Sequence, residues 1–353
     1  MSEYHVSLMA KGQKAEVQAL MQASFGASLA PIFFIHPETT LVVTYQERVV
    51  AGLNIDLYDV NAEVKMGYIG WLYTHPEHRG KGLAGLLLDH AIPFLQRLGC
   101  TDLAACVEGD NPASFRQLEG VGFSRLSLRG QLSRFKFGTA KVWRHASRFF
   151  DMGYFLYHRR LDDQPVPPIP SGIKALLLTV VANLLIALPI LLHLHIPALF
   201  GLSLITRAPL LLIAIPLTLL ARDGAMALTG RAMGRKTAYY GWDTAYVAGL
   251  LVPLLTGLPF PVPGNRYIAE EGWSLRTDAR TLSVMAMTSN LSLGVVCFFL
   301  PNLYTFILLI LDTFFSFYPF CGFNASRLRR HGKTGILVSL FVLLACTIQV
   351  LVY

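Results

Sequence analysis

The sequence predicts a chain of two parts, an α/β domain followed by an all-α, multi-span membrane domain. Residues 1–163 mix charges, glycines and alternating apolar residues, whereas the chain beyond residue 170 contains several long uncharged runs. Residues 161–170 contain four prolines. Because proline fixes φ and lacks a backbone donor, this segment is expected to be a short, stiff linker.

Apolar periodicity and turn residues predict alternating helices and strands in the first part. Two β-rich runs separated by three polar residues are typical of a hairpin, and a third run leads through a glycine-containing turn into an amphipathic helix. The expected elements are a helix at 11–25, strands at 40–45, 49–56 and 64–74, a helix ending near residue 99, a strand at 101–107 and a helix at 111–119 closed by 120–123.

The turn after the strand at 64–74 carries the clearest chemical signal. It contains Gly80 and Gly82 directly before the next helix. Backbone N–H groups at a helix N-terminus present partial positive charge to a phosphate, and glycines allow the ligand to approach the backbone closely. The turn therefore predicts a phosphate-binding site.

Residues 71–88 resemble the signature of GNAT acyltransferases, Arg/Gln-x-x-Gly-x-Gly/Ala, with Arg79, Gly82 and Ala84 at its defining positions. Residues 111–123 resemble a second motif of that family, and the resemblance extends from residue 1 to about residue 130. It implies an α/β GNAT fold, a mixed sheet with flanking helices that is splayed between its fourth and fifth strands.

The resemblance also implies a cosubstrate, acetyl-CoA or another acyl-CoA, in the cleft of that sheet. Its pyrophosphate would lie on the amides of residues 79–84, and its pantetheine arm on the backbone near residues 72–74. The expected CoA-binding residues are Leu72, Thr74, Arg79, Gly80, Lys81, Gly82, Leu83, Ala84, Asn111 and Ser114.

Acyl transfer to an amine needs a base, because a free amine is largely protonated at neutral pH. Asp56, Glu108 and His75 lie at predicted strand ends near the cleft and are the candidates. Many GNAT members carry a tyrosine that protonates the leaving thiolate where this chain has Leu118. Either the thiolate leaves unassisted or Tyr73 takes that role.

The second part contains apolar runs suited to membrane spans. The run at 246–258 is short and ends in a proline-rich stretch, so we expect it to enter the membrane and return, which leaves about five full spans. Basic residues lie in the connections between runs, which predicts a cytoplasmic N-terminal domain and an external C-terminus. The expected full spans are 175–192, 208–228, 282–300, 304–320 and 336–353.

Residues 222–234 resemble the zinc-binding helix of site-2-protease-type intramembrane metalloproteases, and 258–268, 287–291 and 319–328 follow in the order of that family's later motifs. By this resemblance, Arg222 and Met226 occupy the positions of the histidine ligands, Asp223 that of the general base and Asn324 that of the aspartate ligand. Catalytic zinc needs three protein ligands and a water, so no metal site and no proteolysis are expected.

Arg222 and Asp223 leave three structural interpretations open. They form an intramembrane ion pair, mark the cytoplasmic end of a span, or line a polar cavity inherited from the protease, because ionisable groups at membrane depth tend to face one.

The expected domains are a GNAT acyltransferase domain at 1–135, a basic juxtamembrane segment and proline-rich linker at 136–172, and a site-2-protease-like transmembrane domain without zinc ligands at 173–353. The net charge is +8, but much of the basic excess adjoins apolar segments, which indicates an anionic lipid surface rather than nucleic acid. The five cysteines show no metal-ligand spacing.

These observations favour an integral membrane, acyl-CoA-dependent N-acyltransferase acting on an amine of a lipid, a lipidated peptide or a membrane protein. The expected partners are acyl-CoA, that membrane-associated acceptor and the lipid bilayer. The alternative is an acyl-CoA-sensing regulatory protein with a pseudoprotease membrane domain, which the absence of the usual tyrosine at Leu118 supports. A third hypothesis, an active intramembrane metalloprotease, lacks its ligands.

Overall fold

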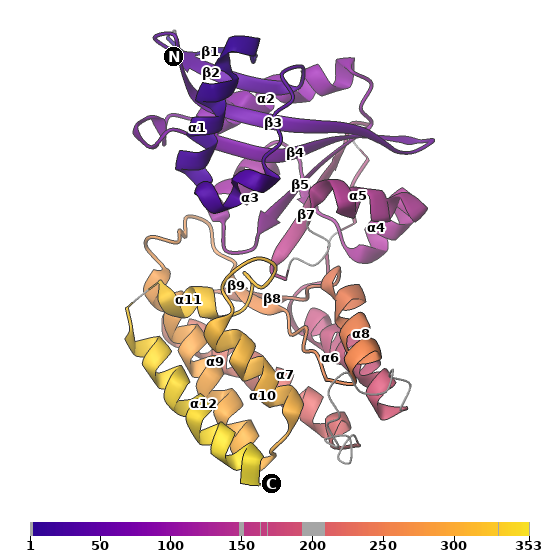
Figure 1. Cartoon of the computed structure of the whole chain (residues 1–353), viewed down its shortest axis with the longest axis vertical. Helices are drawn as coiled ribbons and strands as arrows, with labels where there is room; N and C mark the ends of the chain where they lie inside the picture. Colours follow the sequence, from indigo (N-terminus) through magenta and orange to yellow (C-terminus); the bar gives the residue numbers. More distant parts are fainter. Residues whose placement is uncertain are drawn as a thin grey trace. The chain divides into compact units, whose positions relative to one another are not determined.

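The structure, a computed structural model, describes residues 3–147, 152–162, 164–167, 169–192, 209–330 and 332–352. The chain forms two compact units (Figure 1). The first comprises Met1–Val107, Ala113–Arg148 and Leu156–Pro168, and the second comprises Glu108–Pro112, Phe149–Phe155 and Ile169–Tyr353.

A mixed seven-stranded sheet with the strand order β1-β2-β3-β4-β5-β7-β6 organises the N-terminal part of the chain. Strands β1 to β4 are antiparallel neighbours, and β4 pairs with β5 in parallel. The strands are β1 (His5–Leu8), β2 (Thr40–Tyr45), β3 (Arg48–Asn61), β4 (Val64–Thr74), β5 (Asp102–Glu108), β6 (Ser124–Arg125) and β7 (Tyr154–Arg160).

The sheet opens between β4 and β5. Their register pairs Met66 with Asp102 and Tyr68 with Ala104, but β4 continues to Thr74 and β5 to Glu108. The two strands therefore separate along their C-terminal halves. The mixed sheet that is splayed between its fourth and fifth strands, expected from the GNAT resemblance, is confirmed.

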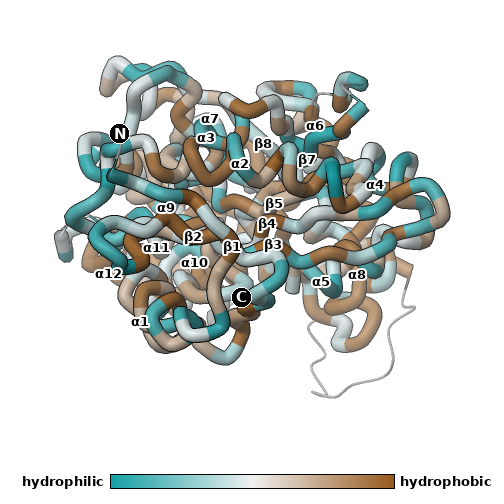
Figure 2. The backbone as a smooth tube through the Cα atoms, turned by 90° about the horizontal axis from the view of Figure 1, so that it is seen from above, coloured by the Kyte–Doolittle hydropathy of each residue, from teal (hydrophilic) through white to brown (hydrophobic). Residues whose placement is uncertain are grey.

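Helices cover both faces of this sheet. Gly67 of β4 faces Leu95 of α2 (Leu83–Arg97), whereas Met66 and Tyr68 pack in a cluster with residues of α4 (Leu128–Phe135) and α5 (Thr139–Ala146). Because neighbouring residues of a strand point to opposite faces, α2 lies on one face and α4 and α5 on the other. Figure 2 shows hydrophobic stretches along the central strands β3, β4 and β5.

Helix α1 (Lys14–Phe25) buries Val17, Leu20 and Met21 in a cluster with Trp71 and Tyr73 of β4. Helix α3 (Pro112–Gly120) follows β5, as expected from the sequence. The short helices are η1 (Lys11–Gln13), η2 (Ala27–Ile32), η3 (Pro76–His78) and η4 (Lys136–Gly138).

The segment 136–172, expected to be juxtamembrane chain and linker, contains regular structure. Helix α5 packs on the sheet face next to Tyr58, and β7 pairs with β6 through Ser124–His158 and Arg125–Tyr157. The sheet therefore extends to Arg160. Strand β7 (Tyr154–Arg160) was not predicted, because its apolar residues do not alternate with polar ones and its last three residues are polar or basic.

Helices dominate the second unit, together with an antiparallel strand pair in which Thr237 lies opposite Ile268. This pair corrects the all-α expectation in one detail. The elements are α6 (Gly172–Leu191), α7 (Leu211–Ala232), β8 (Thr237–Tyr240), α8 (Ala245–Thr256), β9 (Asn265–Ile268), α9 (Ala279–Phe299), α10 (Leu303–Phe314), α11 (Ala325–Arg329) and α12 (Thr334–Val352).

The helix expected over 304–320 is shorter, since α10 ends at Phe314. Pro319 disfavours helical conformation in the residue before it. The chain turns back instead, so that the backbone N–H of Asn324 donates to Asp312 Oδ1 at 3.0 Å.

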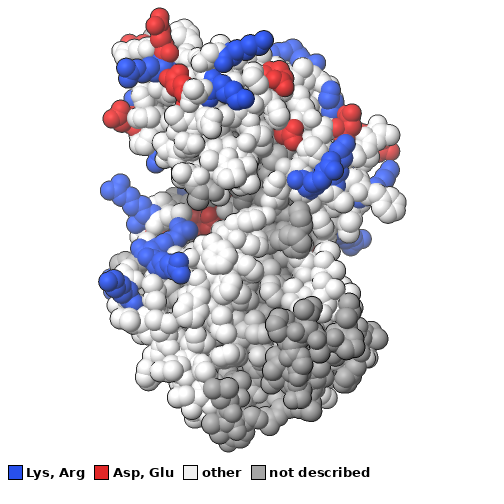
Figure 3. Space-filling model, viewed as in Figure 1, with Lys and Arg blue, Asp and Glu red and all other residues white. Residues whose placement is uncertain are grey.

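Among the described residues, α6, α7 and α9 are long and apolar enough to cross a membrane. Large apolar side chains also point outward from several helices of this unit, including Leu177 and Leu185 of α6, Leu212 of α7 and Phe341 of α12. Figure 3 shows a surface without Lys, Arg, Asp or Glu over α10 and α12. An apolar surface this extensive is unusual for a protein surrounded by water.

Candidate active site

The turn between β4 and α2 has the geometry of an anion-binding loop. After η3, the backbone takes positive φ angles at Gly80 (+75°) and at Gly82 (+77°), the residue that precedes the helix. Residues with a Cβ rarely adopt this conformation. The glycines thus let the chain turn sharply into the first turn of α2.

The N-terminus of α2 has no side-chain cap, because the residue at the cap position is Gly82. The first N–H groups of a helix have no partner inside it, so those of Leu83 and Ala84 are suited to bind an external acceptor. Two exposed cations flank the turn. Arg79 Nε donates to the carbonyl of Thr74 at 3.2 Å, and Lys81 Nζ donates to the Tyr4 hydroxyl at 3.1 Å.

Strand β4 leads into this turn along the splayed edge. Leu72 lies opposite Leu53 of β3, and Thr74 lies opposite Ala51. The β3–β4 register shifts between Asn54 and Ile55, which leaves Gly70 as an extra residue of β4. Such bulges bend a strand and redirect its groups. A Cβ on Gly70 would lie 2.3 Å from the Phe34 ring, so a larger residue there would force that ring to move.

The remaining expected CoA-binding residues lie at the start of α3. Ser114 is in its first turn, and the Asn111 backbone N–H donates to the Glu108 carbonyl at 3.0 Å. The carboxylate of Glu108, a candidate base, lies 3.6 Å from the Arg330 guanidinium within the second unit.

Asp56, another candidate base, makes a contact that was not predicted. Its Oδ2 lies 2.7 Å from Nδ1 of His145, which is on α5. The imidazole stacks on the Tyr58 ring, with centroids 3.8 Å apart and planes 14° apart. Asp56 is therefore paired with a histidine that was not among the predicted site residues.

Tyr73 is buried, and its hydroxyl donates to Asn54 Oδ1 at 2.9 Å. Burial raises the pKa of Tyr73 well above its ordinary value. The hydroxyl therefore stays protonated at neutral pH and is committed to an internal partner. Its role as the acid for the thiolate remains a prediction.

His75 lies just after β4, and its Nδ1 accepts a hydrogen bond from the Glu77 backbone N–H at 3.4 Å. The ligand atoms of His75, Glu77 and His78 lie within 4.8 Å of one another. Slight burial and the nearby Lys81 ammonium lower the pKa of His78, which favours its neutral form. Among the described residues, this group has the composition to hold a metal ion.

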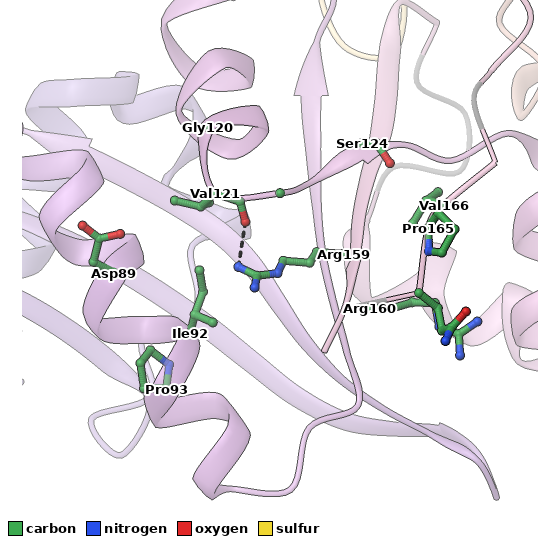
Figure 4. Close-up of a pocket in the computed structure, with 12 residues that line it drawn as sticks. Asp89, Ile92, Pro93, Gly120, Val121, Ser124, Arg159, Arg160, Pro165 and Val166 are labelled. Carbon is green, nitrogen blue, oxygen red and sulfur yellow. Dashed lines mark hydrogen bonds between the residues drawn. The ribbon is translucent and has the colours of Figure 1, made fainter. Parts of the chain in front are cut away.

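A cavity of ≈ 800 Å³ lies elsewhere on the first unit, beside α2 and the end of α3 (Figure 4). Ile92, Val121 and Pro165 supply apolar walls, and Arg159 crosses the cavity to donate to the Val121 carbonyl at 2.7 Å. None of the expected site residues lines it.

The second unit has a buried polar core around the positions that resemble protease ligands. Arg222 donates to both carboxylate oxygens of Asp312, at 2.8 and 3.0 Å, and Asp223 accepts two hydrogen bonds from Arg266, at 2.7 and 2.6 Å. One interpretation of the sequence was that Arg222 and Asp223 form an ion pair with each other. The structure shows that they do not. Each forms an ion pair with a residue distant in the sequence.

Asn324, at the position that resembles the aspartate ligand, joins the same core. Its side-chain amide donates to Asp312 Oδ2 and to Ser289 Oγ, both at 3.1 Å. Met226 is fully buried on α7. The carboxylate of Asp312 is thus occupied by a guanidinium and an amide.

Residues 10–123 match the model of the acetyltransferase (GNAT) family. The N-terminal part of the chain is therefore a GNAT acetyltransferase domain. Two curated proteins are similar over a shorter stretch. N-alpha-acetyltransferase 30 of Saccharomyces cerevisiae is 38% identical over 60 residues, 17% of this chain and 34% of that protein.

The second curated protein is the L-methionine sulfoximine/L-methionine sulfone acetyltransferase of Salmonella typhimurium. It is 37% identical over 67 residues, 19% of this chain and 39% of that protein. The chain thus spans little more than a third of the length of the curated relatives it matches.

Solved structures resemble part of the chain as well. A crystal structure of the NatC complex bound to Gag peptide and CoA has a TM-score of 0.35 and 21% identity, covering 45% of this chain and 99% of that one. The ribosomal-protein-S18-alanine N-acetyltransferase of Escherichia coli has a TM-score of 0.32 and 14% identity, covering 45% and 94%.

Proposed function

We propose, from a GNAT domain matched over residues 10–123, that this protein transfers an acetyl group from acetyl-CoA to an amine at a membrane. The observation that carries the proposal is the turn with Gly80 and Gly82 in the left-handed conformation at the uncapped start of α2, beside the splayed edge of β4. The names of both curated relatives are those of acetyltransferases, which supports acetyl as the transferred group.

In this proposal the pyrophosphate of acetyl-CoA lies on the amides of the turn and of Leu83 and Ala84, where the helix N-terminus favours negative charge. Arg79 and Lys81 add positive charge at its rim. The pantetheine arm runs along β4 near Leu72 and Thr74, beyond Tyr68, where the described pairing of β4 with β5 ends. The thioester then lies between β4 and β5, and most of the catalysis comes from aligning it with the amine.

The acceptor in this proposal is an amine held at a bilayer: that of a lipid, a lipidated peptide or a membrane protein. The outward-facing leucines of α6 and the phenylalanine of α12 support a lipid environment for the second unit. In this proposal the first unit lies in the cytoplasm and the C-terminus lies outside, as the basic connections between the apolar runs indicate.

A second candidate function is acyl-CoA sensing without turnover, and Leu118 is the observation that favours it. Leu118 is buried in α3, where many GNAT members carry the tyrosine that protonates the thiolate. In this alternative the second unit is a pseudoprotease that binds a transmembrane partner. Its buried pairs, Arg222 with Asp312 and Asp223 with Arg266, support a non-proteolytic role.

Radiolabelled acetyl-CoA tests the proposal against the alternative. The full-length protein is reconstituted into vesicles that contain phosphatidylethanolamine, with and without a membrane-spanning peptide that has a free N-terminal amine. The proposal predicts transfer of label to the lipid or the peptide. Binding of acetyl-CoA without transfer to any amine would support the sensor instead.

A further inference from the structure

The first unit contains a carboxylate–imidazole pair on the sheet face opposite α2. Asp56 Oδ2 and His145 Nδ1 are 2.7 Å apart, and both side chains are partly exposed, at 22% and 23%. The pairing joins β3 to α5 across 89 positions of the sequence. A carboxylate at one ring nitrogen fixes the tautomer that leaves the other nitrogen free to take a proton.

The surroundings of His145 hold its ring in one orientation. Tyr58 stacks on one side of the imidazole, and Val142 and Ala146 of the same helix are buried in the cluster that includes Tyr58 and Tyr68. Among the described residues, none forms a hydrogen bond to Nε2 of His145. Nδ1 of His145 is therefore held by the Asp56 carboxylate, while Nε2 has no hydrogen-bond partner within the described residues.

The pair lies level with the opening of the sheet. Asp56 is opposite Tyr68 of β4, and Tyr68 is opposite Ala104 of β5, the last residues in register before these strands separate. The three residues form a row across the sheet, so Asp56 is two strand spacings, or about 10 Å, from β5. A general base acts at hydrogen-bond distance or through one water, so the attacking group has to extend from the opening onto this face, next to Tyr68, to reach the imidazole.

A second observation indicates that this face receives a ligand. Tyr58 is 7% exposed, and its hydroxyl has no hydrogen-bond partner within the described part of the chain. A buried hydroxyl without a partner is costly, so a polar group of a ligand or a water is expected to meet it. Burial, and then the nearby Asp56 carboxylate, raise the pKa of Tyr58, so it remains a donor.

We infer that His145 is the general base of the transfer reaction and that Asp56 is the positioning residue that orients it. This assignment rests on the proposed function. The attacking group is the acceptor amine or a water molecule. Its nitrogen or oxygen forms a bond to the thioester carbonyl carbon while Nε2 of His145 takes a proton from it. The carbon–sulfur bond then breaks, and CoA leaves as the thiolate, which takes up a proton from solvent.

Release of the CoA thiol from acetyl-CoA tests this role without knowledge of the acceptor, because water serves as the attacking group. His145→Gln keeps an N–H donor for Asp56 but cannot accept the proton, and we expect a loss of about 100-fold or more. Asp56→Asn should lower kcat with little change in KM. His90→Ala is the matched control, since His90 is exposed on α2 and, within the described residues, bonds only the carbonyl of Leu86. The rate of this variant should be unchanged.

Two further measurements separate this role from a purely structural one. Added imidazole should restore thiol release in His145→Ala but not in His145→Gln, where no space is created. Calorimetric titration with acetyl-CoA should give the same Kd for all variants. A wild-type protein that fails to bind acetyl-CoA overturns the proposed function, whereas normal binding with equal thiol release by wild type and His145→Gln overturns the role of His145.

Discussion

Arg222 holds Asp312 through two hydrogen bonds of 2.8 and 3.0 Å inside the second unit, and its third contact is the carbonyl of Gly264 at 3.1 Å. By resemblance, Arg222 stands where a metalloprotease has a zinc-binding histidine. The guanidinium brings positive charge and occupies the nearest carboxylate, so a divalent cation would be repelled and left without ligands.

We therefore predict that the purified protein contains no zinc in the second unit. Elemental analysis of protein prepared without chelators should find less than stoichiometric metal. The described group of His75, Glu77 and His78 in the first unit is the control, because any metal bound there should be lost in His78→Ala. Stoichiometric zinc that disappears in Asp223→Asn or Asn324→Ala would revive the hydrolase hypothesis.

Breaking the Arg222–Asp312 pair should destabilise the second unit. Removing one partner leaves a buried charge uncompensated, which costs about 3–5 kcal/mol, whereas replacing both with apolar residues is often tolerated. We expect a large fall in the thermal midpoint in detergent for Asp312→Leu and a smaller one for Arg222→Met combined with Asp312→Leu. Additive losses in the double variant would argue against direct pairing.

Acid should weaken the first unit through Asp102. Asp102 is fully buried and accepts hydrogen bonds from His158 and Arg134, at 2.7 Å each. Burial alone would raise the pKa of Asp102, but these bonds lower it far below the ordinary value. Its stabilising contribution is therefore present above the unfolded-state pKa of about 4 and is lost as the pH falls below it.

We predict that Asp102→Asn lowers the unfolding free energy at pH 7 by about 3–5 kcal/mol and removes part of the acid dependence of stability. Tryptophan fluorescence during thermal unfolding between pH 2.5 and 7 measures both effects. Asp89→Asn, on the exposed side of α2, should follow the wild type. If the stability of Asp102→Asn fell with decreasing pH as steeply as that of the wild type, groups other than Asp102 would be responsible for the acid dependence.

The outward-facing leucines of α6 should contact lipid. Leu185, 55% exposed, faces away from its unit, and in water its replacement by aspartate would have little effect. At the centre of a membrane helix the same replacement costs about 2.5–3.5 kcal/mol. Leu185→Asp should therefore reduce the carbonate-resistant membrane fraction, while Leu98→Asp on the first unit should not. Equal fractions would exclude lipid contact at Leu185.

The C-terminus should lie on the external side. A cysteine reporter placed after Tyr353 should react with an impermeant maleimide added to intact cells, because the basic connections indicate a cytoplasmic first unit and an odd number of crossings. Labelling only after the membrane is opened would make the number of crossings even, and would mean that α8 does not return to the side from which it enters.

The central part of the first unit could be predicted from the sequence and from its resemblance to the GNAT family. The strand 64–74, the Gly80–Gly82 turn and the helix after it are local in sequence, and their periodicity and glycines were sufficient to place them. The parts that were missed depend on distant contacts. Strands β1, β6 and β7 are short or polar and form through pairing with neighbours, so their own residues carry little signal.

The same distinction applies to the site. The CoA turn was predicted because its residues are contiguous, but His145 was not, because its partner Asp56 lies 89 positions away and no local pattern joins them. In the second unit, Arg222 and Asp223 were noted as unusual charges in an apolar run. Their partners, Asp312 and Arg266, could not be assigned without the arrangement of α10 and β9.

The most direct test of the central claim is calorimetric titration of the full-length protein with acetyl-CoA. A tryptophan at Gly82 would fill the turn with a bulky side chain and strain a residue whose φ is +77°. Gly99 has the same φ of +77° at the other end of α2 and open space around it, so Gly99→Trp is the matched control. We predict binding by the wild type and Gly99→Trp and none by Gly82→Trp; equal affinity in all three proteins would contradict the assignment of the CoA site.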